Sequence, residues 1–160
     1  MSFKTNWRGQ NINLVEISVI EGERREQIFI NECEKYTDKT IIKQSKYSPF
    51  DFKIKSIRNI AIEMKSYNYA HDERKSFMIG KDKIDIFEEM MTTNNIFLIF
   101  GFYPKNINTI TYKYLKITDI SILKTSPFTW EKKQHYNINT SLMKDIKEFY
   151  DILNSIKLNT

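Results

Sequence analysis

The sequence predicts a single α/β (α+β) domain in which a mixed central sheet is flanked by helices. Three observations support this fold class. Residues 60–67 alternate between apolar and polar side chains, as a strand with one buried face does. Residues 96–103 form an apolar run ending before Pro104, which suits a strand buried on both faces. Segments with helical spacing precede, separate and follow the strands, and this order is typical of sheet-and-helix layers.

Length and composition limit the classes of protein that the chain can be. It has 160 residues, of which 41% are hydrophobic and 28% charged, so we expect one domain over residues 1–160. Its longest apolar run is far shorter than the ~20 residues that span a bilayer. The polar start lacks a secretory signal, so we expect an intracellular protein, cytoplasmic or, in a eukaryotic host, nuclear. One cysteine and two histidines argue against a disulfide framework and a Cys/His zinc site.

The first half of the chain contains a helix and three strand-like segments. Residues 12–20 indicate a short strand or an extended lead-in, and we expect a helix after Gly22. That helix carries an apolar stripe at helical spacing, formed by Phe29, Ile30 and Cys33. Three strands should follow, at residues 40–47, 50–54 and 60–67. Residues 55–59 should form the turn between the second and the third strand.

The second half predicts a helix, further strands and a final helix. Residues 81–91 have apolar side chains at helical spacing, and strands are expected at residues 96–103, 109–117 and 120–123. A last amphipathic helix should begin near Ser141, because its apolar residues form one stripe.

The positive charge is concentrated in one window. The chain carries a net charge of +5, and the residues from Lys39 to Arg58 alone contain six basic residues and one acid. Such a window is either a solvated hairpin face or a surface that meets a polyanion, with nucleic acid the commonest partner. Trp7, Trp130 and the nine tyrosines include candidates for stacking on bases, although most of these rings should be core.

Three residues of the predicted hairpin form a candidate reactive site. Glu63 and Lys65 are two apart on an alternating strand, so their side chains should share one face. Asp51 lies one strand upstream. Acid–x–Lys triplets recur in this chain, but this one is interleaved with core residues. A charged pair on a half-buried strand costs stability unless it has a use.

This combination suits metal-dependent cleavage of a phosphodiester bond. Two carboxylates from neighbouring strands can converge on Mg²⁺, a hard cation that prefers oxygen ligands, and Mn²⁺ should substitute for it. The metal would activate a water molecule and shield the phosphate charge. The Lys65 ammonium can stabilise the developing negative charge. The simpler alternative is a cross-strand salt bridge.

The segment Pro49-Phe50-Asp51, the hairpin and Glu63-Met64-Lys65 resemble the PD-(D/E)XK nuclease superfamily, which includes phage and viral endonucleases and Holliday junction resolvases. The literal Pro-Asp dipeptide is absent. The resemblance covers roughly residues 22–103 and implies a restriction-endonuclease-like αβββαβ core. Residues 104–160 would add strands and the C-terminal helix.

The resemblance also implies residue roles and partners. Asp51, Glu63 and Lys65 would be catalytic, and the first helix would offer a third acid to the metal, Glu26 or alternatively Glu23. A lysine at the start of the second helix, Lys83 or Lys81, would point into the cleft. The implied activity is a Mg²⁺-dependent DNA endonuclease, a hydrolase that acts on DNA, and a homodimer is one assembly that the resemblance allows. The residues expected to contact DNA are Lys43, Lys46, Lys53, Arg58, Lys81 and Lys83.

Three hypotheses follow for the function. The first is the metal-dependent endonuclease, as a duplex cutter or as a structure-specific resolvase of the Holliday-junction type. The second is a non-catalytic nucleic-acid-binding module with the same fold. The third is an unrelated α/β accessory protein in which the motif is accidental. Binding alone does not need two acids facing a polyanion, which favours the first hypothesis.

Overall fold

A computed structural model of the chain describes residues 3–5, 11–105, 108–118, 120–124, 127–130 and 132–158. Side chains are described from Val19 onward, Ile122 excepted. Within these ranges, every helix is too short or too polar to cross a bilayer.

A mixed sheet of six strands forms the centre of the molecule. Its strand order is β11–β8–β7–β5–β4–β3. The central pair β5 and β7 is parallel, and the other neighbours are antiparallel, so the predicted mixed sheet is confirmed. The strands are β3 (Ile41–Lys43), β4 (Phe52–Ile54), β5 (Ile57–Tyr67), β7 (Asn95–Phe102), β8 (Thr111–Ile117) and β11 (Lys144–Asp145).

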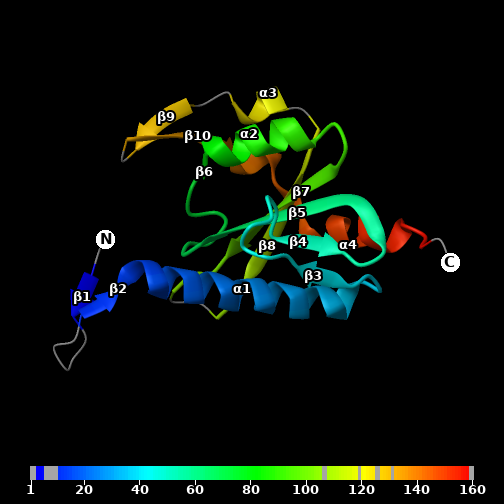
Figure 1. Ribbon diagram of the computed structural model, residues 1–160, viewed down its shortest axis with the longest axis horizontal. Coiled ribbons are helices and arrows are strands. Elements are labelled where there is room, and N and C mark those ends of the chain that lie inside the picture. Colours follow the sequence, from blue (N-terminus) through cyan, green and yellow to red (C-terminus); the bar gives the residue numbers. More distant parts are fainter. Residues whose placement is uncertain are drawn as a thin grey trace.

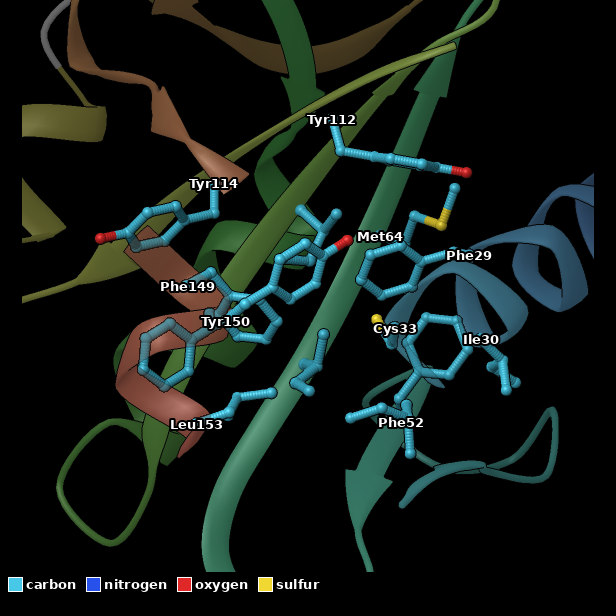
Figure 2. Packing of buried hydrophobic residues seen from close by; sticks show 14 of the residues in the cluster. Phe29, Ile30, Cys33, Phe52, Met64, Tyr112, Tyr114, Phe149, Tyr150 and Leu153 are labelled. Atoms are coloured by element: carbon cyan, nitrogen blue, oxygen red, sulfur yellow. The ribbon is translucent and has the colours of Figure 1, made fainter. Parts of the chain in front are cut away.

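Two helices cover one face of this sheet. Helix α1 (Leu14–Tyr36) runs along β3, and α4 (Ile146–Ser155) packs beside β8 (Figure 1). Figure 2 shows Phe29 and Cys33 of α1 and Phe149 and Leu153 of α4 directed at the same apolar layer. All four are fully buried, which confirms the predicted stripes of the first and last helices.

The other face carries a second, mixed layer. It contains α2 (Lys81–Met90), the short α3 (Ile120–Leu123) and a three-stranded sheet of order β6–β10–β9 (Figure 1). The three strands are β6 (Ser76–Gly80), β9 (Pro127–Trp130) and β10 (Lys133–Asn139). The remaining elements are the pair β1 (Phe3–Thr5) and β2 (Asn11–Asn13) and the 3₁₀ helix η1 (Thr140–Leu142).

The alternation of β5 distributes its side chains between these two layers. Ile60, Ile62 and Met64 belong to the core under α1 and α4, whereas Ala61 belongs to the core under α2. Glu63 follows Ala61 at the period of two, so it lies on the α2 side. The predicted division of this strand into two faces is confirmed.

Two predicted strands are wrong. Residues 12–20 hold only the last two residues of β2 and then enter α1, so Gly22 lies inside the helix rather than before it. Ion pairs from Glu21 to Arg24 and Arg25 support the helix across this glycine. Residues 120–123 form α3, which lies against α2 and β10 and contributes Leu123 and Ile120 to the core under α2. A four-residue apolar run is compatible with a strand and with a helix, so its periodicity does not distinguish them.

The last helix begins later than predicted. Asp145, rather than a residue near Ser141, is its N-cap, and the Asp145 side chain accepts from the Lys147 N–H at 2.9 Å. The sequence pattern predicts neither β9 nor β10. Strand β10 is polar over much of its length, and its partner β6 lies more than fifty residues earlier in the chain, while the four-residue β9 pairs with β10.

Candidate active site

Asp51 is held at the start of β4 by the edge of β5. Strand β4 begins at Phe52, so the Met64 N–H of β5 lies just beyond the backbone pairing of the two strands. This N–H donates instead to Asp51 Oδ2 at 2.9 Å. The Phe52–Ile62 and Lys53–Ala61 pairs define the register of the hairpin. One further step of that register places Asp51 opposite Glu63. The structure therefore brings the two predicted acids together.

Glu63 is a buried carboxylate with one unpartnered oxygen. Glu63 as a whole residue is 2% exposed, and its Oε1 lies 2.9 Å from Nζ of Lys83 on α2. Among the described residues, Oε2 has no hydrogen-bond partner. Burial and, to a smaller extent, the charge of Asp51 raise the pKa of Glu63 to about 7, although Lys83 and Lys65 oppose the shift.

Glu26 approaches the same region from α1. It forms an ion pair with Lys43 of β3 at 3.2 Å, and its side chain is 21% exposed. Burial raises the pKa of Glu26; Lys43 opposes this shift, and the charge of Asp51 adds to it. Since Asp51 raises the pKa of both Glu26 and Glu63, the three carboxyls share one electrostatic environment.

A groove of about 350 Å³ gathers most of these groups. Asp51, Glu26 and Lys83 line it together, and so do Lys43 and Lys46. Glu63 does not line the groove itself; it is connected to it through Lys83. Glu23, the alternative helix-borne acid, also lines the groove, but it is more exposed than Glu26.

Lys65 lies on the same face of β5 as Glu63, two residues further on. It is partly buried, and its charge lowers the pKa of Glu63. Within the described part of the chain, no acid lies within ion-pair distance of the Lys65 ammonium, so this cation is available to a phosphate.

The other predicted DNA contacts are distributed unevenly. Lys53 is exposed on β4, opposite Ala61 and two residues from Asp51. Lys81 pairs with Asp85 at 2.6 Å and does not line the groove. Arg58 is exposed near the hairpin turn, roughly 16 Å along β5 from Glu63 at 3.3 Å per residue. Arg58 is thus not brought to the groove.

One wall of the groove is formed by residues that the sequence pattern does not indicate. The loop between β3 and β4 contributes Gln44, Ser45 and Ser48 to it. The Gln44 N–H donates to the Asp51 carbonyl at 2.7 Å, which closes this loop around the acid. The Ser-Pro pair before Asp51 is a turn signal that could have indicated the wall.

Each of the three candidate carboxylates already has a partner in the protein itself. Among the described residues, no three His, Cys, Asp or Glu side chains form a ready-made metal site. Glu63 and Glu26 instead pair with lysines, and Asp51 accepts from a backbone N–H. The donor set nevertheless fits a divalent cation, since all three are carboxylates and the buried Oε2 of Glu63 has no partner among the residues that the structure describes.

Comparison with solved structures identifies the fold. The chain is similar to Hjc from Archaeoglobus fulgidus, a Holliday junction resolvase, with a TM-score of 0.54 and 13% identity over 82% of this chain and 96% of that one. It is also similar to D212, a fusellovirus nuclease, with a TM-score of 0.45 and 14% identity over 88% and 87% of the two chains. No protein-family model and no curated protein matches the sequence. The chain has the restriction-endonuclease-like fold, as its Asp51 and Glu63 motif predicted.

Proposed function

We propose that this protein is a Mg²⁺-dependent DNA endonuclease that hydrolyses phosphodiester bonds, with Mn²⁺ able to replace Mg²⁺. The observation that carries the proposal is the buried Glu63 carboxylate, which faces Asp51 across the hairpin and whose Oε2 has no hydrogen-bond partner in the described part of the chain. A buried charge without full compensation costs several kcal/mol in general, so a fold that keeps one has a use for it.

The proposed metal ligands are Asp51, Glu63 and Glu26. When bound, the metal would lower the pKa of a water molecule and shield the charge of the phosphate. The chain's own residues do the remaining work. Asp51 is held in place by the Met64 N–H, and Lys83 favours the charged form of Glu63, which is the form that can bind a cation.

Lysines in and beside the groove are suited to hold the DNA strand. Lys65 has no acidic partner within ion-pair distance in the described part of the chain, so its ammonium is free to stabilise the negative charge that develops on the phosphate. Lys46 lines the groove, and Lys53 is exposed two residues from Asp51; both suit contacts with flanking phosphates.

A cleavage assay tests the proposal. The purified chain is incubated with plasmid, four-way-junction and flap DNA, with Mg²⁺, with Mn²⁺ and with EDTA. We expect metal-dependent nicking that Glu63→Gln and Asp51→Asn abolish. The exposed acid Glu89 on α2 provides the matched control, Glu89→Gln, which should cut like the wild type.

The same assay separates the alternatives. Cleavage that is confined to the four-way junction would identify a Holliday-junction-type resolvase; the similarity to the fold of Hjc motivates this arm. A resolvase needs two cuts, for which a homodimer would supply two active sites. DNA binding without cleavage under every metal condition would favour the non-catalytic module.

A further inference from the structure

A second groove lies between β5, β6 and the β9–β10 hairpin. It has a volume of about 760 Å³, about twice that of the groove at Asp51. Tyr67 at the end of β5 and Phe77 of β6 form part of its lining, and their rings pack against each other with centroids 4.6 Å apart. The groove is thus backed by a fixed aromatic layer.

Exposed aromatic rings stand at the sides of this groove. Tyr69 is 40% exposed and Trp130 is 50% exposed, and both line it together with Phe128. Rings of this size are normally buried, so two of them open to solvent in one concave surface indicate a binding surface. Their flat faces suit nucleobases, because every base presents a π-face for stacking.

The charge of this groove matches a nucleic-acid backbone. Arg74 and Lys75 both line it, and none of its described lining residues is acidic. The Arg74 guanidinium carbon lies 3.9 Å from the centroid of the Tyr69 ring, so a cation–π contact holds this cation at the groove wall. Aromatic side chains combined with cations are the pattern of single-strand binding, whereas a duplex hides its base faces.

The second groove lies further along β5 than the proposed active site. Tyr67 lies on β5 at the same alternation as Glu63 and Lys65, four residues beyond the first and two beyond the second. At 3.3 Å per residue it is roughly 13 Å along the strand from Glu63. A DNA strand whose phosphate lies at Lys65 could therefore place its neighbouring nucleotides in the second groove.

We propose that this groove binds unpaired nucleotides of the DNA strand that is cut, by stacking on Tyr69 and Trp130 and by phosphate contacts to Arg74 and Lys75. The preferred substrate then carries a single-stranded segment beside the cleaved bond, as a flap or a fork does, rather than a continuous duplex. This inference rests on the proposed nuclease function for its statement about cleavage, but its binding part can be measured without any metal.

Binding of an oligo(dT) 15-mer and of a blunt 15-bp duplex in EDTA provides the first test. We expect Tyr69→Ala and Trp130→Ala each to weaken oligo(dT) binding by at least about fivefold and to change duplex binding by less than about twofold. The matched control is Tyr36→Ala, since Tyr36 is an exposed tyrosine (55%) of α1 in the opposite layer. Circular dichroism melting confirms that each variant is folded. Unchanged oligo(dT) affinity in both groove variants overturns the proposal.

The salt dependence of binding provides the second test. Arg74→Gln combined with Lys75→Gln should flatten the slope of log affinity against log salt by up to about 1.4 for oligo(dT), since each phosphate contact contributes about 0.7 on single strands. Trp130→Ala should weaken binding without changing that slope. In a Trp7→Phe background, the fluorescence of Trp130 should fall on binding; Trp7 lies outside the described residues. A slope unchanged by the double substitution overturns the role of the two cations.

A cleavage comparison completes the design. With Mg²⁺, the wild type should cut a flap faster than the matching duplex, and Trp130→Ala should lose this preference. If the protein never cuts but oligo(dT) binding depends on Tyr69 and Trp130, the nuclease proposal fails and the groove assignment stands. If it cuts flap and duplex equally and the groove variants bind like the wild type, the groove assignment fails and the nuclease proposal stands.

Discussion

Lys83 Nζ lies 2.9 Å from Glu63 Oε1, and this ion pair joins α2 to the middle of β5. The two side chains differ in environment. The Glu63 side chain is buried, with 3% of its surface exposed, whereas the Lys83 side chain is 33% exposed and lines the groove beside Asp51. A cation entering that groove would therefore compete with Lys83 for Glu63. This relationship gives the candidate site a built-in counterion and leads to the first three predictions.

The stability of the protein should depend on the ionisation of Glu63. Its pKa is raised from 4.5 to about 7, so the folded state binds more protons than the unfolded state between these values, and stability falls as the pH rises through this window. Glu63→Gln removes this loss. The variant should exceed the wild type by up to about 3 kcal/mol at pH 8, with the difference fading towards pH 4. Melting temperatures measured from pH 4 to 8 check this, and Glu89→Gln should track the wild type at every pH.

Divalent cations should stabilise the wild type. A ligand that binds only the folded state adds about 2.7 kcal/mol at a concentration one hundred times its Kd, so Mg²⁺ or Ca²⁺ should raise the melting temperature and EDTA should reverse the rise. The increase should be absent in Asp51→Asn and in Glu63→Gln. Metal stabilisation that persists undiminished in both variants would place the cation elsewhere.

Lys83 should act as a positioning residue for Glu63. Its charge opposes the rise in the pKa of Glu63, so Lys83→Met should raise that pKa further and move the acid limb of the kcat/KM profile to higher pH. Lys83→Arg should restore most of the wild-type profile. Lys124→Met, which removes a lysine from the Glu88 pair in the same layer, is the matched control. If Lys83→Met lowers kcat/KM equally at every pH and leaves the acid limb at its wild-type position, Lys83 has a different role.

The basic window should contribute to DNA binding through individual contacts. Neutralising Lys43, Lys46, Lys53 and Arg58 together should flatten the slope of log affinity against log salt for duplex DNA by about 0.9 per genuine contact. Single substitutions should rank these residues: Lys46 in the groove and Lys53 beside Asp51 should contribute most, and Arg58 at the distant turn least. Filter-binding titrations at several salt concentrations measure each slope. Equal slopes for all four single variants and the wild type would make the window a solvated face.

Not every lysine of that window is a surface charge. Lys39 is 5% exposed, and its ammonium pairs with Asp38 at 2.8 Å, so it cannot meet a phosphate in this structure. A charge count along the sequence treats Lys39 like Lys46, because it cannot register how the chain between α1 and β3 covers the Lys39 side chain.

Features that depend on neighbours within a few residues could be predicted from the sequence. The alternation in β5 assigned Ile62 and Glu63 to opposite faces, and the stripe of α1 identified Phe29 and Cys33 as core, because side-chain direction repeats every 2 residues in a strand and every 3.6 in a helix. The pairing of Asp51 with Glu63 followed from the same hairpin, since the two residues are only twelve apart.

Features that depend on packing between distant segments could not be predicted in this way. Residues 120–123 are a helix because α2 and β10 enclose them, and β10 is a strand because β6 provides its backbone partners. The pairing of Lys83 with Glu63 and the groove of Tyr69 and Trp130 likewise require elements far apart in the chain to meet. Local propensity does not encode such contacts, because the energy that selects them comes from burial and hydrogen bonds formed after the layers assemble.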